Sequence, residues 1–212
     1  MIKIDNFEVF NLRGAIFGMR NPLESWGKSD SEIINGEFII GNTDKELAFK
    51  LIKAGSDHRK FMRQILVSVD ITAPMTWWWD MDTYKVASVK NSTSRMHKLG
   101  SRSLTPADFS WDDQYGYTHI TPLRQYVLND LNERILKFQR LKKENEIEAA
   151  MYIWRDIILD LPDSYNFYST WTGNYEILRN IYHSRKNHKQ HEFHTFCNEI
   201  EKMPYSEFIT TK

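Results

Sequence analysis

The stretch QILVSVDITAP, residues 64–74, decides the fold. Apolar and polar side chains alternate along it, which is the two-residue period of a half-buried strand. The apolar set is Ile65, Val67, Val69 and Ile71. Ala73-Pro74 follows directly, and proline suits the first turn of a helix because its missing N–H needs no partner there. We therefore predict a strand over residues 64–72 that runs into a helix carrying Trp77, Trp78 and Trp79.

Upstream of this strand, the apolar residues alternate near the start of the chain, and residues 1–20 are predicted to be extended. Residues 21–36 are rich in Ser, Gly and Pro and are predicted to form an irregular loop. Thr43-Asp44-Lys45-Glu46 has the form of a capping box, so a helix is predicted from about Asp44 to Ala54.

Downstream, residues 100–120 are predicted to be a loop, and Thr121-Pro122 begins a helical pair that extends to about residue 161. A short extended piece, Phe167 to Thr172, comes next. The rest of the chain to about Lys202 is predicted to be helical, with a break near residues 186–189. Runs of helices that alternate with isolated strands indicate an α+β fold, which we expect to form a single domain over residues 1–212.

Composition limits the possible functions. The chain has 212 residues and a formal net charge of zero, which argues against a whole-protein electrostatic hold on nucleic acid. No run of 18 apolar residues is present, so we expect no membrane span and a cytoplasmic protein. The only cysteine, Cys197, lies in an apolar helical stretch and is predicted to be a buried core thiol rather than a nucleophile.

The stretch Ser92-Thr93-Ser94-Arg95 has the chemistry of a phosphate site. Hydroxyl and loop N–H groups donate hydrogen bonds, and a guanidinium binds two oxygens at once. A Ser/Thr-rich surface turn with an exposed arginine is the commoner meaning of such a stretch. The residues alone leave both interpretations open.

A basic, histidine-rich stretch, residues 183–191, allows either an anion site or a solvated helix face. His191 and His194 are three residues apart and could share a helix face. No Cys or carboxylate completes a known zinc pattern beside them, so we predict no metal site.

Two segments resemble the flavin-dependent thymidylate synthase family. In the first, residues 57–96, the strand and Ala-Pro junction precede a stretch similar to the family signature R-H-R-x-x-S-x-N-E-x-S-x-R-Y. Ser88 and Arg95 match it, and Thr93 keeps a hydroxyl where the family has its second serine. Residues 83–85, Thr-Tyr-Lys, replace Arg-His-Arg, and Asn91 replaces the glutamate. His58 matches a histidine upstream.

The second segment, residues 171–192, looks like the family's Trp-Thr-x-Asn turn entering a helix. Asn174 ends the turn, and Asn180 and Arg185 follow at the family's spacing. The family's Gln-x-Glu resembles Gln190-x-Glu192, with one residue fewer before it. The two segments cover about a third of the chain, and the second is the more specific.

The resemblance implies a sheet flanked by long helices, antiparallel or mixed, in a homotetramer that binds dUMP and FAD where subunits meet. It implies transfer of a methylene group from methylene-tetrahydrofolate to dUMP, with a hydride from reduced flavin. Thr93 would be catalytic. The implied contacts to the deoxyuridine nucleotide are Arg95, Arg185, Asn91 and Ser92. The implied contacts to the flavin are Asn174, Asn180, Lys85, Ser88 and His58.

The sequence is compatible with three functions. An enzyme of the methyltransferase type is favoured, because the family spacing of Asn174, Asn180 and Arg185 is kept. A nucleotide-binding or regulatory protein without chemistry is the alternative, because two of the three Arg-His-Arg cations are lost. Binding of single-stranded nucleic acid through the basic stretch is the third, and the zero net charge counts against it.

Overall fold

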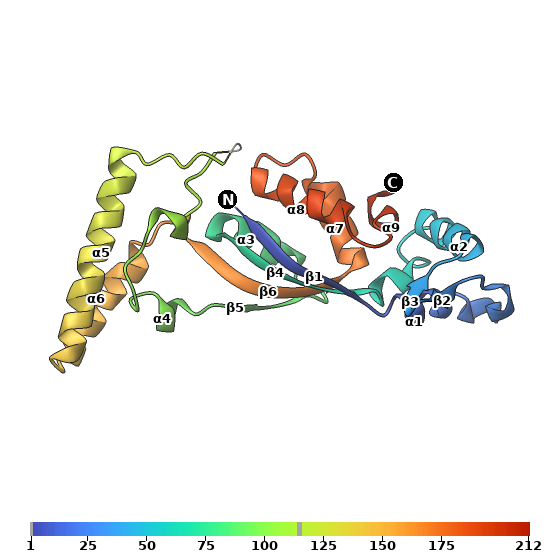
Figure 1. Cartoon of the computed structure of the whole chain (residues 1–212), viewed down its shortest axis with the longest axis horizontal. Coiled ribbons are helices and arrows are strands. Elements are labelled where there is room, and N and C mark those ends of the chain that lie inside the picture. The colour runs from blue at the N-terminus through green and yellow to red at the C-terminus, as the bar shows by residue number, and fades with distance from the viewer. Residues whose placement is uncertain (1, 114–115) are drawn as a thin grey trace. The chain divides into compact units, whose positions relative to one another are not determined.

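A computed structural model describes residues 2–113 and 116–212 and shows an α+β fold, as predicted. The main sheet has the strand order β1-β4-β6-β5 (Figure 1). Its strands are β1 (Lys3–Phe10), β4 (Leu66–Pro74), β5 (Val89–Ser92) and β6 (Asn166–Asn174). A separate two-stranded sheet pairs β2 (Glu32–Ile34) with β3 (Glu37–Ile39).

The chain divides into two compact units, and the division falls inside β4 and β6. Unit 1 contains Ile71–Thr83 and Asn91–Ser169, with the N-terminal residues to Lys3. Unit 2 contains Ile4–Asp70, Tyr84–Lys90 and Thr170–Lys212. The expectation of a single domain over residues 1–212 stays a prediction.

The strands β4 and β6 are antiparallel. At the unit 2 end, the N–H of Tyr175 donates to the carbonyl of Ile65 at 3.1 Å. At the unit 1 end, the N–H of Met75 donates to the carbonyl of Tyr165 at 3.3 Å. Residue numbers rise along one strand as they fall along the other, which is the antiparallel arrangement.

Both strands run into a helix without a loop. β4 continues into α3 (Met75–Met81), with Pro74 at the N-cap, so the predicted junction is confirmed. β6 continues into α7 (Tyr175–Arg185), where the Asn174 side chain accepts a hydrogen bond from the N–H of Ile177 at 3.0 Å. The predicted inward face is confirmed, because Ile65, just before β4, and the β4 residues Val67, Val69 and Ile71 have no exposed surface.

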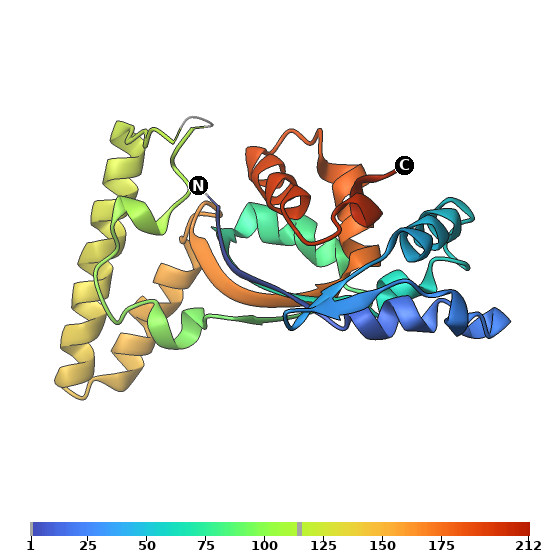
Figure 2. The same cartoon turned by 45° about the vertical axis from the view of Figure 1, so that its right-hand side comes forward.

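Unit 1 is built around a pair of long helices, α5 (Pro122–Lys143) and α6 (Ile147–Leu159), which lie side by side (Figures 1 and 2). The predicted start at Thr121-Pro122 is confirmed, since the Thr121 hydroxyl accepts from the N–H of Arg124. The short elements η5 (Pro106–Asp108) and α4 (Arg95–Lys98) belong to this unit. The stretch of chain between α4 and α5 supplies side chains to the core of this unit, namely Leu104, Phe109 and Trp111.

Unit 2 packs its helices on α7. These are α8 (His191–Glu201), α9 (Glu207–Thr210) and the short η3 (Lys60–Arg63), while α9 also contacts α2 (Asn42–Lys53). Figure 2 shows the three C-terminal helices as one group in orange to red. The predicted helical C-terminus with its break after Arg185 is confirmed. The remaining elements in this unit are α1 (Leu12–Gly18), η1 (Asn21–Leu23) and η2 (Trp26–Lys28).

The prediction of an extended segment over residues 1–20 was wrong beyond Phe10. Asn11 takes a left-handed conformation with φ 63°, which ends β1. The helix α1 follows, and its inward residues Ala15 and Ile16 are buried. Leu12, Ile16 and Met19 recur at helical spacing, a signal that the alternation in β1 obscured.

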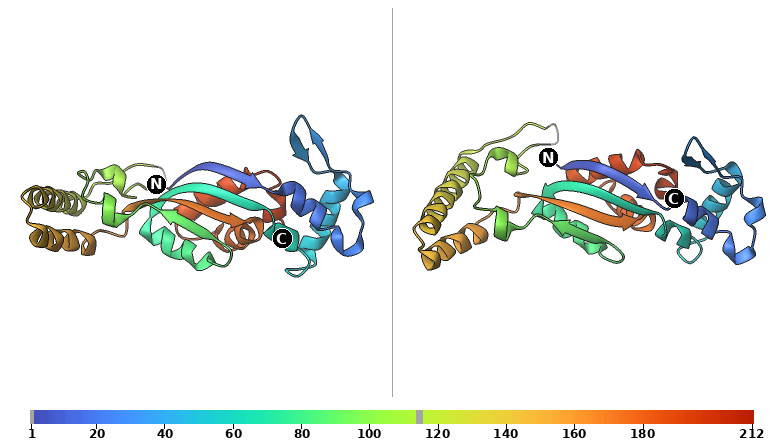
Figure 3. Two further views of the ribbon diagram at one scale, coloured as in Figure 1. Left: turned by 90° about the horizontal axis from the view of Figure 1, so that it is seen from below. Right: turned by 60° about the horizontal axis from the view of Figure 1, so that its bottom comes forward.

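The loop predicted over residues 21–36 was also wrong at its end, where β2 and β3 form a hairpin (Figure 3). Asn35 and Gly36 form its turn with φ values of 52° and 87°. Asn-Gly is the strongest short-range hairpin signal, because a tight hairpin turn needs positive φ at both central residues. Ile33 lies opposite Phe38 in the antiparallel pairing.

The helix predicted near Asp44–Ala54 is confirmed, but its predicted capping box is not. α2 begins after Gly41, and the carboxylate of Asp30 accepts hydrogen bonds from the N–H groups of Thr43 and Asp44 at 2.8 and 3.1 Å. A carboxylate from the preceding segment therefore satisfies the free N–H groups of the first turn.

A buried ion pair ties α2 to the chain just after α1. Arg20, 3 % exposed, donates through Nε to the carboxylate of Asp44, which has no exposed surface, at 2.6 Å. The hydroxyls of Ser29 and Ser31 donate to the other carboxylate oxygen. Burial alone raises the pKa of Asp44, but these two hydroxyls and the guanidinium together hold it below its ordinary value.

We expect Asp44→Asn to lower the free energy of unfolding by about 3–5 kcal/mol, because Arg20 keeps its charge in a buried place without its partner. Urea unfolding followed by circular dichroism measures this. The folded pKa of Asp44 is lowered, so its contribution is present above the unfolded pKa and is lost as pH falls through the folded pKa. The variant should therefore lose less stability on acidification than the wild type.

The matched control is Asp5→Asn, which removes an exposed carboxylate from β1. It should change the free energy of unfolding by less than about 0.5 kcal/mol. Equal losses in the two variants would contradict a stabilising role for the Arg20–Asp44 pair.

Candidate functional site

The loop after β5 carries the residues predicted to contact a nucleotide. The N–H of Thr93 donates to the carbonyl of Tyr168 at 2.9 Å, and the Ser92 and Ser169 hydroxyls lie 2.7 Å apart. These contacts fix the loop to β6. They leave Asn91 and Thr93 exposed in unit 1.

Arg95 begins α4, directly after this loop. Its side chain is held by an aromatic ring, with the guanidinium carbon 5.4 Å from the centre of the Phe167 ring. This is within the range of a cation–π contact, which orients a guanidinium without neutralising it. Four predicted residues, Asn91, Ser92, Thr93 and Arg95, thus lie together in unit 1.

Thr93 also lines a polar cavity of about 270 Å³ in unit 1. Two cations that the sequence did not single out line it too, Lys98 and Arg102. Arg102 makes a two-pronged ion pair with Asp108, so its charge is compensated. Burial raises the pKa of Asp108, but the bond from Arg102 and the N–H and hydroxyl of Thr105 lower it below its ordinary value.

The other lining groups of this cavity are mostly hydroxyls, amides and aromatic rings. They include Thr72, Ser101, Tyr165, Asn166 and Tyr168. Lys98 is exposed at the end of α4, and the described residues show no ion pair for it. A cavity with one uncompensated cation, hydroxyl donors and ring faces suits a small planar anion.

His58 lines a second cavity, of about 450 Å³, in unit 2. Its walls are apolar side chains from α1, η1, α2 and η3, with a few polar groups. The apolar members are Met19, Pro22, Leu23, Leu47, Leu51 and Phe61, and the polar ones include Ser25, Asp57, Lys60 and Gln64. A mostly apolar cavity with a few polar groups is the usual form of a site for a planar organic ring.

Lys85 and Ser88 lie on the turn between η4 (Asp82–Tyr84) and β5. The Ser88 hydroxyl donates to the carbonyl of Tyr84 at 2.7 Å, so it shapes the turn. Ala87 within this turn has φ 61°, a left-handed conformation that costs an alanine about 1–2 kcal/mol. Lys85 is exposed.

The predicted residues at the N-cap of α7 and within α7 have different environments. Asn174, 4 % exposed, uses its side-chain oxygen to cap the helix, and Asn180 is exposed. Arg185, the last residue of α7, donates through Nε to the Tyr84 hydroxyl at 3.0 Å. The capping role of Asn174 was not predicted, although Asn before a helix is a standard N-cap signal. Contacts of these residues to a flavin stay a prediction.

The chain matches solved structures over nearly its whole length. Two are flavin-dependent thymidylate synthase ThyX from Helicobacter pylori with FAD and dUMP. They share 14 % identity, with TM-scores of 0.62 and 0.65, and the matches cover 98–99 % of this chain and 96–97 % of theirs. The chain has the flavin-dependent thymidylate synthase fold. At this identity the likeness establishes the fold alone.

A third solved structure that the chain matches is the UMP/dUMP methylase PolB from Streptomyces cacaoi, bound with 5-Br dUMP. It shares 16 % identity with a TM-score of 0.58, and the match covers 95 % of this chain and 89 % of that one. No family model matches the sequence, and no curated protein matches it.

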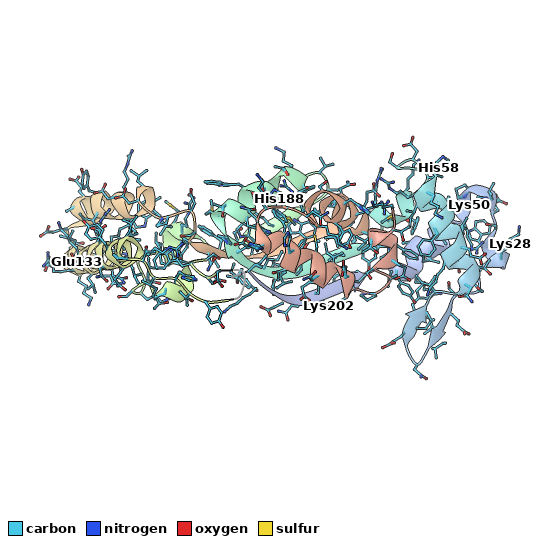
Figure 4. The ribbon with its side chains drawn as sticks, turned by 90° about the horizontal axis from the view of Figure 1, so that it is seen from above. Lys28, Lys50, His58, Glu133, His188 and Lys202 are labelled. Atoms are coloured by element: carbon cyan, nitrogen blue, oxygen red, sulfur yellow. The ribbon has the colours of Figure 1, made fainter. Side chains whose placement is uncertain are left out.

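Each predicted site residue belongs to one of the two units of the chain. The predicted residues in unit 2 are His58, Lys85, Ser88, Asn174, Asn180 and Arg185. Within it, His58 and Arg185 occupy different places: Figure 4 shows His58 near Lys50 of α2, whereas His188, a partner of Arg185, lies among the C-terminal helices.

His188, His191 and the nearby His194 make contacts within the protein. The His194 ring lies 2.7 Å from the carbonyl of His188, and the His191 and His194 rings meet edge to face. Across residues 2–113 and 116–212, no three His, Cys, Asp or Glu side chains gather as a metal site would need. Within the same residues, no helix combines the length and apolar character needed to cross a membrane.

Cys197 lies in α8 and is 2 % exposed, so the predicted core position is confirmed. Burial raises the pKa of its thiol to about 11. We expect no reaction of the folded protein with a thiol reagent at pH 8, because the thiolate fraction is reduced about 100-fold relative to a thiol with the ordinary value of 9.0.

Mass spectrometry after brief treatment with iodoacetamide measures this. The same treatment in 6 M guanidinium chloride is the control and should modify Cys197 fully. Rapid modification of the folded protein would mean that the thiol is accessible and reactive.

Proposed function

We propose that this chain binds a deoxyuridine nucleotide and FAD and transfers a one-carbon unit to the nucleotide. The observation that carries the proposal is the match over 95–99 % of the chain to structures described as thymidylate synthases with FAD and dUMP and as a dUMP methylase. The resemblance of residues 57–96 and 171–192 supports it independently, since it comes from the sequence.

The nucleotide is assigned to the polar cavity of unit 1. Lys98 supplies the positive charge for a phosphate, and the exposed Thr93 supplies a hydroxyl at the position of the family's serine. Tyr165 and Tyr168 offer ring faces for a pyrimidine. Contacts from Asn91, Ser92 and Arg95 to the nucleotide belong to the same proposal, and a nucleotide contact from Arg185 of unit 2 is proposed from the resemblance alone.

The flavin is assigned to the His58 cavity of unit 2. Its size and apolar walls fit a fused ring, and Lys60 and Gln64 offer donors for polar ring atoms. Lys85 retains one cation for the phosphates, and Ser88, Asn174 and Asn180 complete the proposed set. Reduced flavin, when bound, supplies a hydride, and methylene-tetrahydrofolate is the proposed one-carbon donor. A homotetramer and a cytoplasmic location are part of the same proposal.

A nucleotide-binding protein without catalysis is the second candidate. Thr83 and Tyr84 stand where the family has Arg and His, and the Tyr84 hydroxyl accepts a hydrogen bond from Arg185. Each lost charge-assisted hydrogen bond costs about 1.5–3 kcal/mol of binding, which weakens retention of a flavin. Binding to single-stranded nucleic acid has less support, because the net charge is zero.

We expect the purified protein to retain a flavin absorbance band after incubation with excess FAD and removal of free ligand, and the band to shift when dUMP is added. Leu51→Trp should abolish retention, because the larger side chain fills the His58 cavity. Leu123→Trp, at a 70 % exposed position of α5, is the control and should retain FAD. A bare spectrum with and without dUMP would reject the flavoenzyme and favour the second candidate.

We expect Lys98→Ala to weaken dUMP binding by about 10- to 100-fold, because a charge-assisted hydrogen bond to the phosphate is lost. Isothermal titration calorimetry measures this. Lys137→Ala removes an exposed cation from α5 and should leave the dissociation constant unchanged. An unchanged dissociation constant of Lys98→Ala for dUMP would show that the phosphate does not bind in this cavity.

A further inference from the structure

Asn166 brings a carboxamide to the wall of the polar cavity in unit 1. It is the first residue of β6 and is half-buried. Tyr168 lies two residues further along the strand and lines the same cavity. Because alternate residues of a strand point to the same face of the sheet, both side chains lie on the cavity side of β6.

The oxygen of this amide is already engaged. The Ser110 hydroxyl donates to Oδ1 of Asn166 at 2.8 Å. The segment that carries Ser110 is fixed beside the start of β6, because the N–H of Ser110 donates to the carbonyl of Ser164 at 2.8 Å and Phe109 forms an antiparallel bridge with Tyr165. The hydroxyl therefore holds the amide in one orientation, with its nitrogen as the group that remains for a ligand.

The amide nitrogen of Asn166 makes no hydrogen bond within the part of the chain that the structure describes. It carries two N–H donors and cannot accept. A half-buried donor of this kind is satisfied by a ligand that supplies a carbonyl oxygen. It stays unsatisfied when the ligand supplies another N–H, which costs binding free energy.

The carboxylate in the same cavity offers little to a ligand that donates hydrogen bonds. Both oxygens of Asp108 accept from the guanidinium of Arg102, and one of them also accepts from the N–H and the hydroxyl of Thr105. Lys98 adds a cation, which only donates. The cavity therefore favours a ligand edge that carries oxygen acceptors.

The pyrimidine bases differ in this respect at ring position 4. Uracil has a carbonyl oxygen there, whereas cytosine has an amino group. The uracil oxygen accepts from an amide N–H, but the cytosine amino group sets one donor against another. A site built around one hydrogen bond strongly rejects a ligand that lacks the matching group, because the polar group of the site is then left unpaired.

We propose that Asn166 selects uracil over cytosine by donating from Nδ2 to the oxygen at position 4 of the base. This rests on the proposed function, which assigns a deoxyuridine nucleotide to the polar cavity. Ser110 is a positioning residue, because its hydroxyl holds the amide oxygen away from the ligand.

The test is isothermal titration calorimetry with dUMP and dCMP, which carry the same sugar and phosphate. We expect the wild type to bind dUMP about 10- to 100-fold more tightly than dCMP, because the amide donor stays unsatisfied with dCMP. Asn166→Asp replaces the donor with an acceptor and should lower this ratio by about 10-fold or more. The added negative charge acts on both phosphates alike, so it cancels in the ratio.

Asn129→Asp is the matched control. Asn129 is exposed on α5, and its side-chain oxygen also accepts a hydrogen bond, from the amide of Gln125 at 2.8 Å. This variant makes the same chemical change outside the cavity and should keep the wild-type ratio.

Ser110→Ala is a second, independent variant. It keeps Asn166 and releases the amide oxygen, so the amide can rotate and offer that oxygen to dCMP. The ratio should therefore fall in this variant too. Circular dichroism checks that each variant is folded, and Ser110→Ala decides the matter if Asn166→Asp does not fold.

The outcomes separate this assignment from the proposed function. Equal binding of dUMP and dCMP by the wild type, or a ratio that neither cavity variant changes, would overturn the assignment and leave nucleotide binding in place. A wild type that binds neither nucleotide overturns the assignment and the proposed function together. The expected ratios without transfer of a one-carbon unit support the assignment and reject only the catalytic part of the proposed function.

Discussion

The antiparallel pairing of β4 with β6 is the constraint on which the rest of the structure depends. Each strand enters a helix without a loop, so the register of the pair fixes where α3 and α7 begin. The Asp70 carboxylate accepts a hydrogen bond from the Thr170 hydroxyl at 2.5 Å in the middle of the pair. Because side chains alternate between faces, a one-residue slip would expose the inward set of β4 and move both helices.

The sequence was sufficient for the elements whose signals are local and strong. The strand at residues 64–72, the helix start at Thr121-Pro122 and the break after Arg185 follow from periodicity and capping chemistry. The misses have physical reasons. Asn11 ends β1 through a left-handed conformation, and the cap of α2 comes from Asp30, twelve residues before the helix begins. Neither fact belongs to a local pattern.

The candidate site, too, could be predicted only in part from the sequence. Motif spacing identified Thr93 and His58, and each lines a cavity. Lys98 was missed because its importance depends on Arg102 being compensated by Asp108, which only the folded chain reveals. From the sequence, Tyr84 was only a position where the family has a cation and this chain has none. In the structure its hydroxyl contacts Arg185, about a hundred residues away. A substitution that removes a charge from a motif can thus add a contact elsewhere.

The Arg20–Asp44 pair has a consequence for how this fold can vary. The pair joins the two ends of the segment that contains the β2–β3 hairpin, and both of its side chains are buried in unit 2. The hairpin turn is exposed, and doubling a flexible loop adds only about 0.6 kcal/mol of closure entropy. Lengthening or shortening at residues 35–36 therefore leaves the His58 cavity wall intact. Unit 2 has in this hairpin a place where new recognition elements can evolve without refolding the protein around them.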